Sequence, residues 1–312
     1  MKAAALFIIA LGATCMPSPA QDALDFLPND PTRTTKQLFM TTVRIENSDG
    51  RKTNYGTGFL VDTLETNKSF MQRMFIVSNK HVITNFPDAT IYFIPRSYGG
   101  NDLFGQVTCA KVEDWRNHWV LHPSPDVDVA ILPFTEITQA TAPNPAVSNG
   151  VFNIGNVGWP TTSMLTTNNL RQFQAIESVV FLGYPSGVYD TTHTLPISRQ
   201  GTTASPLTVD FLGRRCFAVD AAVFPGSSGS PVFLYNPIGY LDSHGGMMQS
   251  RVLLVGIIAE NYYVNAENVF TLRQVPSDWT GTFTNAQPFN LGIAFRSDTI
   301  LELLDQYRHT HP

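Results

Sequence analysis

Two series of short apolar runs, each broken by turn residues, constrain the fold of this chain more than any other feature. The first series covers residues 38–40, 55–61, 74–78, 89–94 and 127–132. The second covers residues 178–183, 207–211, 216–219, 231–235, 252–259 and 291–295. Runs of this length, bounded by Gly, Pro, Asn and Asp, are typical of antiparallel strands joined by tight turns. We therefore predict an all-β chain of two antiparallel β-barrels with about six strands each.

The composition agrees with this class. Only 14% of the residues are charged, and the chain holds 22 Gly, 21 Pro and 21 Phe, which suits a turn-rich β protein better than a helical bundle. The formal net charge is −5, and the Lys and Arg residues do not gather in one place. We therefore expect no nucleic acid among its partners.

The first twenty residues have the pattern of an export signal. Lys2 gives a basic start, and residues 3–14 form an apolar run that is too short to span a bilayer. Small residues at Ser18 and Ala20 predict cleavage after Ala20, and hence a secreted or periplasmic protein. Anchoring as a lipoprotein through Cys15 is the disfavoured alternative. No later segment is long and apolar enough to be expected to cross a membrane.

The rest of the chain divides into four parts. We expect a polar leader at 21–37, a first barrel at 38–134, a connection at 135–174 and a second barrel with a terminal helix at 175–308. Residues 165–177 also have helical spacing. Thr299 and Glu302 have the spacing of a capping box at the start of the terminal helix. The apolar face of that helix is formed by Ile300, Leu301, Leu303, Leu304 and Tyr307.

The segment 224–233 carries the clearest chemical signal. Gly226 and Gly229 bracket Ser228, and an apolar run follows. Gly226 reaches backbone angles that let the N–H groups of Gly226 and Ser228 point at one spot, as stabilisation of an oxyanion requires. A Gly/Ser-rich hairpin turn is the plain alternative. The nucleophile elbow of α/β-hydrolases is excluded, because Ser230 stands where that motif has Gly and no helical pattern follows.

A nucleophilic serine needs a base, and the base needs an orienting acid. His81 directly follows an apolar run, where it can face a cleft. Asp128 directly precedes the run at 129–132, and Asp126 lies two residues before it; we favour Asp128. The other histidines are expected to be solvated: His118, His122, His193, His244, His309 and His311.

With these segments in order, the chain resembles serine peptidases of the trypsin/chymotrypsin fold, and most closely the bacterial secreted trypsin-like peptidases. The resemblance spans roughly residues 38–305. It rests on the motifs GTGFLV at 56–61, VSNKHV at 77–82, DVAIL at 128–132 and GSSGSP at 226–231, with FLGYPSG at 181–187 and NLGIAF at 290–295. The order His, Asp, Ser along the chain is also that of this fold.

The resemblance implies a catalytic triad of His81, Asp128 and Ser228 in a cleft between the barrels. It implies an oxyanion hole made by the amides of Gly226 and Ser228. The substrate backbone would pair with Ala259, Glu260 and Asn261, and the pocket before the scissile bond would have Ala222 at its base and Gly292 and Ala294 in a wall. Ala222 carries no charge, which argues against a strong preference for Lys or Arg, while Glu260 would attract a basic side chain at the rim.

Some residues depart from the family pattern. Ser227 stands where digestive enzymes have an Asp that binds a freed N-terminus, so that mode of activation is not expected here. Val82 replaces a cysteine, which removes the first-barrel disulfide of those enzymes. Ala259 replaces a Ser that supports the buried Asp in many relatives, so Asp128 needs another donor.

These observations predict a secreted serine endopeptidase with a polypeptide substrate. The alternative is a catalytically inactive binding or scaffold protein on the same fold. We expect no metal or cofactor, because His309 and His311 have no third ligand nearby and the Gly56–Gly58 segment lacks the rest of a phosphate loop. Cys109 and Cys216 are interpreted as two separate thiols, although a disulfide between them stays open.

Overall fold

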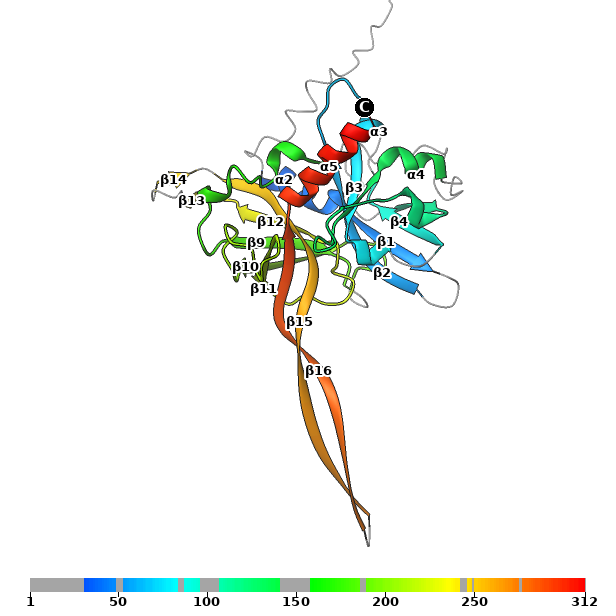
Figure 1. Ribbon diagram of the computed structural model, residues 1–312, viewed down its shortest axis with the longest axis vertical. Helices are drawn as coiled ribbons and strands as arrows, with labels where there is room; N and C mark the ends of the chain where they lie inside the picture. The colour runs from blue at the N-terminus through cyan, green and yellow to red at the C-terminus, as the bar shows by residue number, and fades with distance from the viewer. Residues whose placement is uncertain are drawn as a thin grey trace, which may run out of the picture.

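The computed structural model describes residues 31–48, 53–83, 87–95, 107–140, 158–185, 189–241, 246–248, 250–274 and 277–311. It consists of two β units with a helix at the end of the chain (Figure 1). The expected export signal and Cys15 lie outside the described residues.

The first unit is an eight-stranded sheet with seven strands in the order β5-β4-β1-β2-β3-β7-β6 and β8 added to β2. Its strands are β1 (Thr42–Ser48), β2 (Thr53–Asp62), β3 (Met74–Ser78), β4 (Asp88–Phe93), β5 (Thr108–Val112), β6 (Val120–Leu121), β7 (Ala130–Pro133) and β8 (Trp159–Pro160). Within the described residues, no pairing joins the end strands β5 and β6. The helical segments of this unit are α2 (Pro31–Thr41), α3 (Phe70–Arg73), α4 (Phe134–Ala140), η2 (Lys80–Ile83) and η3 (Trp115–His118).

The second unit is a closed six-stranded barrel in the order β10-β11-β16-β15-β12-β9. Its strands are β9 (Ser178–Gly183), β10 (Ile197–Thr203), β11 (Cys216–Asp220), β12 (Pro231–Asn236), β15 (Arg251–Gln274) and β16 (Ser277–Arg296). The short strands β13 (Tyr240–Leu241) and β14 (Met247–Met248) pair beside it, and η4 (Thr161–Ser163) and η5 (Leu170–Gln172) precede it. With α5 (Asp298–Thr310) at the end, this architecture confirms the predicted all-β, trypsin-like fold class.

Burial follows the strand patterns. Every residue of β3 is buried, while β4 alternates between buried and half-buried positions, as expected for a strand with one face on a core. Each unit has its own core, and a third group of buried residues joins the two units beneath α5. Ile300, Leu303 and Leu304 of α5 lie in that third group, with Leu301 and Tyr307 packed against it, so the predicted apolar face of the helix is confirmed.

β15 and β16 continue far beyond the barrel as one two-stranded hairpin (Figure 1). Their register is unbroken from Tyr263↔Pro288 to Gln274↔Ser277. The sequence predicted only the barrel portions, 252–259 and 291–295, because apolar and polar residues are mixed between them without a clear period.

Several sequence predictions of local structure are wrong. Residues 38–40 belong to α2 and not to a strand, since an apolar run of three residues has no period that separates helix from strand. Residues 207–211 contain a turn and a bend, and only Phe211 pairs, in an isolated bridge to Arg214 across the turn at Leu212 and Gly213, whose φ angles are 57° and 71°. The terminal helix has Ser297 at its N-cap and no side-chain cap, so the capping box at Thr299 is absent.

The helix expected at 165–177 is also wrong. Leu165 instead donates its amide to the Leu254 carbonyl of β15 at 2.8 Å, and η5 supplies the one short helical turn. Leu170 and Phe173 still pack on the core of the second unit, whereas the Ile176 side chain is exposed. The spacing of Leu170 and Phe173 therefore reflects their packing against the barrel, and not a helix.

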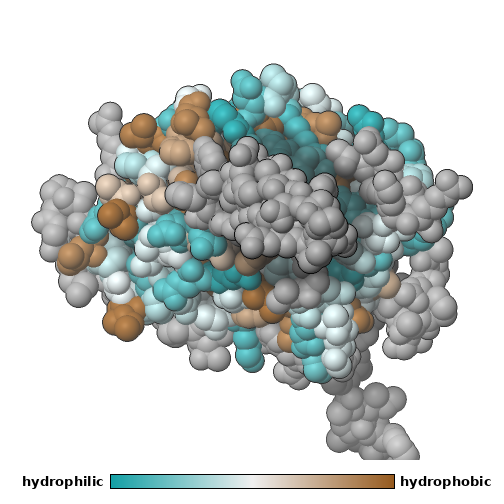
Figure 2. Space-filling model, turned by 90° about the horizontal axis from the view of Figure 1, so that it is seen from below, coloured by the Kyte–Doolittle hydropathy of each residue, from teal (hydrophilic) through white to brown (hydrophobic). Residues whose placement is uncertain are grey.

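On the face shown in Figure 2, hydrophobic side chains lie in small groups among polar ones. Within the described residues, no helix is long and apolar enough to cross a membrane.

Candidate active site

A tight turn before β12 presents Ser228. Gly226 and Gly229 have φ of 87° and 89°, and the Ser230 amide donates to the Ser227 carbonyl at 3.0 Å. A Cβ added to Gly229 would lie 1.7 Å from the Thr57 carbonyl oxygen, so no other residue fits there. Both glycines are thus required by the local backbone, and Ser228 stands half-buried between them.

Residues of the first unit hold this turn in place. The Thr57 amide donates to the Ser228 carbonyl at 2.9 Å, and the Ser78 hydroxyl donates to the Thr57 carbonyl at 2.7 Å. Ser78 ends β3, three residues before His81. The nucleophile turn of the second unit therefore rests against the strand end that leads into His81.

His81 and Asp128 are in direct contact. His81 Nδ1 lies 2.5 Å from Asp128 Oδ2, and the His81 amide donates to Asp128 Oδ1 at 3.2 Å. The Asn79 side chain fixes the backbone of the same residue by donating to the Asp128 carbonyl at 2.6 Å. The Asp128 side chain is 22% exposed and that of His81 is 48% exposed, so the base reaches solvent while its acid is mostly covered.

This geometry separates the two candidate acids. Asp128 engages His81 through both carboxylate oxygens, whereas Asp126 is exposed and lines the neighbouring cleft beside Pro125. The second donor to Asp128 is the His81 amide. It supports the carboxylate in place of the serine hydroxyl expected in many relatives at the position of Ala259.

The hydroxyl of Ser228 donates to the Ala259 carbonyl at 3.3 Å. Ala259 lies on β15, where the pairing with β16 shifts register between Ile258 and Glu260. Because of this bulge, Ala259 is left out of the ladder and its carbonyl faces the nucleophile.

The amides expected to bind an oxyanion lie in the same turn. The Gly226 carbonyl accepts from Thr57 Oγ1 at 2.9 Å, and that hydroxyl in turn accepts from the Tyr184 amide at 2.9 Å. Among the described residues, no hydrogen bond of the structure uses the Gly226 or Ser228 amide as donor. Thr57 fixes the carbonyl side of the turn, and the two amides stay available to a ligand.

A cleft of about 590 Å³ borders His81 and Asp128. It is also lined by Lys80, Pro125, Asp126, Arg214 and Glu260. Arg214 binds Glu260 through two contacts of 2.5 and 3.1 Å, so the rim carboxylate expected to attract a basic side chain already has a cationic partner. Burial lowers the pKa of Lys80, opposed by the charge of Asp128, and its ammonium donates to the Ser124 carbonyl at 2.7 Å.

The residues expected around the primary pocket lie on three neighbouring segments. Ala222 precedes the nucleophile turn, Asn261 lies on β15, and Gly292 and Ala294 lie on β16. Asn261 pairs with Gly292 in the strand register. Asn261 and Gly292 are therefore neighbours on adjacent strands, while Ala294 is buried in the core of the second unit.

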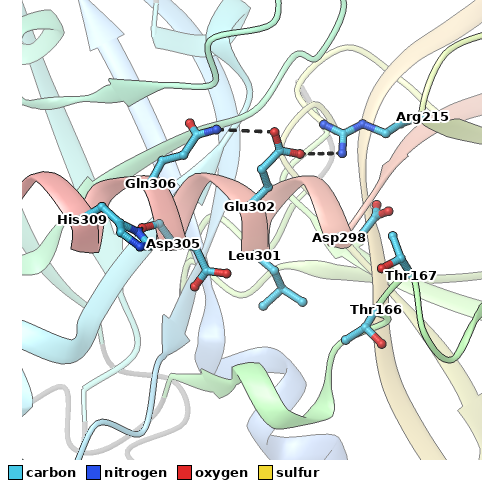
Figure 3. Close-up of a pocket in the computed structure, with 9 residues that line it drawn as sticks. All are labelled: Thr166, Thr167, Arg215, Asp298, Leu301, Glu302, Asp305, Gln306 and His309. Atoms are coloured by element: carbon cyan, nitrogen blue, oxygen red, sulfur yellow. Dashed lines mark hydrogen bonds and ion pairs between the residues drawn. The ribbon is translucent and has the colours of Figure 1, made fainter.

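A second cavity of about 460 Å³ lies along α5 (Figure 3). Its acidic residues are already paired: Glu302 with Arg215 at 2.6 Å, Asp298 with Arg296 at 3.4 Å and Asp305 with Arg308 at 2.9 Å. The first two pairs link α5 to the second unit, and the third lies within α5. The acidic side chains of this cavity therefore stabilise the packing of the terminal helix.

The remaining histidines and cysteines differ partly from expectation. His122 is buried, with its side chain 1% exposed, whereas solvation was predicted. His193, His309 and His311 are exposed, and His118 is half-buried against Glu136. His244 lies outside the described residues. No disulfide joins Cys109 to Cys216, which agrees with their interpretation as two separate thiols, and within the described ranges no group of three potential ligands forms a metal site.

Sequence reasoning missed two contributors to this site. Thr57 was recognised only as part of a glycine-containing motif, and Arg214 was not singled out. The signal for Thr57 was available in that motif, but its partners Gly226 and Tyr184 are far away in the chain, so its role depends on the fold.

Comparison with protein families matches residues 56–236 to the trypsin-like peptidase domain. No curated protein matches the chain by sequence. Among solved structures, the chain is similar to a serine endoprotease from Yersinia pestis, with 14% identity, a TM-score of 0.43 and coverage of 90% of this chain and 67% of that one.

Two further structures are similar to this chain. The thermostable serine protease AL20 from an extremophilic microorganism shows 15% identity and a TM-score of 0.45 over 88% of this chain and 100% of that one. The active form of the Rv3671c protease from M. tuberculosis shows 16% identity and a TM-score of 0.43 over 97% and 93%. With TM-scores below 0.5, these likenesses carry no weight for function.

Proposed function

Because the chain belongs to the trypsin-like peptidase family, we propose that it is a serine endopeptidase. Ser228 is its nucleophile, His81 its general base and Asp128 the acid that orients the base. The observation that carries this assignment is the 2.5 Å contact of His81 Nδ1 with Asp128 Oδ2. That contact leaves Nε2 of the imidazole as the atom that exchanges a proton with the nucleophile.

In the proposed reaction each of these residues acts in turn. Ser228 Oγ attacks the peptide carbonyl carbon while its proton passes to His81. The carbonyl oxygen becomes an oxyanion and is bound by the Gly226 and Ser228 amides. Collapse of this intermediate breaks the C–N bond, and the leaving amine takes the proton from His81. Water then attacks the acyl-enzyme with His81 as base, and the acid product leaves Ser228 restored.

The substrate is a polypeptide that lies along residues 259–261. The bulge at Ala259 exposes a carbonyl beside Ser228, and Glu260 and Asn261 continue along β15. Main-chain hydrogen bonds to such a segment hold an extended peptide in register with the nucleophile.

We also infer export of the chain, with the mature N-terminus at residue 21. The support is the sequence of residues 1–20, with its basic start, apolar run and small residues before the cleavage point. N-terminal sequencing of the protein recovered outside the cytoplasm tests this; a chain that begins at Met1 would contradict it.

A fluorophosphonate probe tests the catalytic assignment. We expect covalent labelling of the wild type, loss of labelling in Ser228→Ala, and cleavage of an unstructured protein such as casein by the wild type only. Folded wild-type protein that is neither labelled nor active would favour the alternative, a binding or scaffold protein on a protease fold. Labelling with cleavage of esters but not of peptides would also overturn the endopeptidase assignment.

A further inference from the structure

The outer parts of β15 and β16 form a long arm that has no part in the proposed reaction. The arm consists of residues 263–274 and 277–288, which pair with each other without a shift in register. At about 3.3 Å per residue it is about 40 Å long. Figure 1 shows the arm projecting away from both units of the protein.

The arm leaves the barrel without a neighbouring strand. Among the described residues, β12 pairs with β15 only as far as Ile257, and β11 pairs with β16 only from Leu291 onward. An isolated two-stranded ribbon is at best marginally stable in water, and it becomes stable when a hydrophobic face packs against another layer. We therefore expect another molecule to supply that layer.

The register assigns each residue of the arm to one of two faces. In a pair of antiparallel strands, cross-strand partners lie on the same face, and successive residues of a strand alternate between the faces. One face takes the even-numbered residues of β15 from Val264 to Gln274 and the odd-numbered residues of β16 from Ser277 to Gln287. The other face takes the remaining residues of both segments.

The two faces differ in chemistry. The first, which we call the apolar face, has no charged residue and contains the large apolar residues of the outer half of the arm: Phe270, Leu272, Trp279 and Phe283. The opposite face contains every charged residue of the arm and a series of threonines: Glu267, Arg273, Asp278, Thr271, Thr280, Thr282 and Thr284. This alternation is typical of a sheet with one covered face and one solvated face.

We propose that the apolar face binds the same face of a second copy of this chain, so that the protein forms a homodimer through its arms. Phe270, Trp279 and Phe283 bury about 150–250 Å² each when covered, which amounts to about 900–1,500 Å² for two copies. Leu272 and Val264 add to this area. Specific interfaces bury about 1,200–2,000 Å² in total, so two arms have the area that a stable dimer needs.

A second arm fits this face better than a substrate peptide does. An extended peptide binds at the edge of a strand through main-chain hydrogen bonds, whereas the apolar face is a surface two strands wide. An identical arm has the same width and length, and a two-fold axis places each apolar face against the other. Because the face carries no charge, its two copies meet without like-charge repulsion.

A lipid surface is the less suitable occupant. Segments that lie on membranes carry basic residues that attract anionic lipids. The arm has a single basic residue, Arg273, against two acidic residues, Glu267 and Asp278. Dimerisation through the arm goes beyond the proposed peptidase function and does not depend on it.

Light scattering after size-exclusion chromatography tests the proposal on the purified protein from about 1 µM to about 100 µM, the weak end of the affinities of interfaces of this size. We expect the wild type to reach twice the mass of one chain. Phe270→Lys adds a charge to the apolar face and is expected to reduce the mass to that of one chain. Val269→Lys is the matched control, because it adds the same charge one residue away on the opposite face, and it should stay dimeric.

A shortened arm keeps the test independent of how well the lysine variants fold. An Asn-Gly turn in place of residues 265–286 joins the paired residues Val264 and Gln287 by a two-residue hairpin. This variant is expected to stay folded by circular dichroism and to be monomeric. A dimer that survives the shortening, or an equal loss of mass in both lysine variants, overturns the proposal.

A wild type that is monomeric over the whole concentration range also overturns the proposal, and two further assays then identify the occupant. Sedimentation of the wild type, but not of the shortened variant, with phosphatidylglycerol vesicles would assign the apolar face to a lipid surface. Loss of casein cleavage in the shortened variant, with a short peptide still cleaved, would assign it to the substrate. Fluorophosphonate labelling of Ser228 tests the peptidase assignment separately, since labelling does not require a dimer.

Discussion

The Thr57 hydroxyl of the first unit donates to the Gly226 carbonyl of the second unit at 2.9 Å. Thr57 is fully buried, and the same hydroxyl accepts from the Tyr184 amide while the Thr57 amide holds the Ser228 carbonyl. One residue thus connects the end of β9 with both ends of the Gly226–Ser228 segment. Ser227 lacks the carboxylate that orders this turn in digestive enzymes, and the Thr57 contacts give the turn another support.

We predict that Thr57→Val lowers kcat by about tenfold to a hundredfold with little change in KM. Valine keeps the shape of threonine but removes the hydroxyl, so the Gly226 carbonyl loses its donor and the oxyanion amides lose their fixed orientation. Loss of one oxyanion donor costs about a hundredfold to a thousandfold, and loss of its support should cost less.

Thr57→Ser is the matched control, because it retains the hydroxyl. It is expected to keep kcat within about threefold of the wild type, on the same scale of donor loss. Steady-state kinetics and the rate of fluorophosphonate labelling measure the effect, and thermal unfolding shows whether the fold survives. A loss in the Ser variant with full activity in the Val variant would mean that Thr57 acts through packing alone.

A second prediction concerns Gly229. Gly229→Ala is expected to abolish labelling and to destabilise the fold by more than about 2 kcal/mol, because the new Cβ would meet the Thr57 carbonyl at 1.7 Å and the backbone has φ of 89°. Gly213→Ala is a suitable control. Gly213 also has a positive φ, 71°, but a Cβ there meets nothing within 4 Å.

The comparison of these two glycines separates the energetic cost of a left-handed backbone from the cost of a steric clash with Thr57. Gly213→Ala should cost about 1 kcal/mol, the penalty of a left-handed backbone alone, and keep full labelling. Urea denaturation and probe labelling provide both readouts. A Gly229→Ala variant as stable and as reactive as Gly213→Ala would show that the turn does not rest on Thr57 in solution.

A third prediction tests the choice of acid. Asp128→Asn is expected to lower kcat by about 10⁴-fold, the loss seen when the acid of a serine-peptidase triad becomes an amide and favours the wrong imidazole tautomer. Asp126→Asn makes the same chemical change two residues away. The Asp126 carboxylate is exposed and does not share the contact that Asp128 makes with His81. Its kcat should stay within about threefold of the wild type on the same scale. Similar losses in both variants would contradict the assignment of Asp128.

The main parts of the site were predictable from the sequence because each is carried by a local pattern. His81 follows a buried strand, Asp128 precedes one, and Ser228 lies between glycines with forced backbone angles. Such patterns survive without knowledge of the fold. The contact of His81 with Asp128 then follows from the pairing of β3 with β7, which places Ser78 opposite Ala130.

What the sequence did not predict depends on contacts between distant residues. The Thr57–Gly226 bond and the Asn261–Val223 bond join separate segments, and nothing in their local sequence states the partner. Residues 38–40 and 207–211 were assigned as strands because apolar runs of a few residues carry too little periodic information. His122 was expected in solvent because its neighbours are polar, yet the packing of α5 against the loop that leads to Asp128 covers it.

The burial of His122 leads to a prediction about stability and pH. Its Nδ1 accepts from the Ser124 amide at 3.2 Å, and its Nε2 lies 3.3 Å from the Arg215 guanidinium and 3.8 Å from Glu302. Burial, with the charges of Arg215 and Lys80, lowers the pKa of His122, while Glu302 opposes the shift. The folded state therefore binds a proton less readily than the unfolded state, whose histidine has a pKa of about 6.5.

Since the unfolded chain gains the proton first, the free energy of unfolding should fall as the pH drops below about 6.5, by at most about 1.4 kcal/mol per pH unit from this residue. Urea denaturation from pH 8 to pH 5 measures this slope. His122→Gln keeps hydrogen-bonding groups without a titrating ring, so its slope should be shallower than that of the wild type. His309→Gln changes an exposed histidine whose Nδ1 contacts the main-chain carbonyl of Asp305, so it is the matched control and should leave the slope unaltered. Parallel slopes for the wild type and His122→Gln would show that His122 is not protected from protonation in the folded protein.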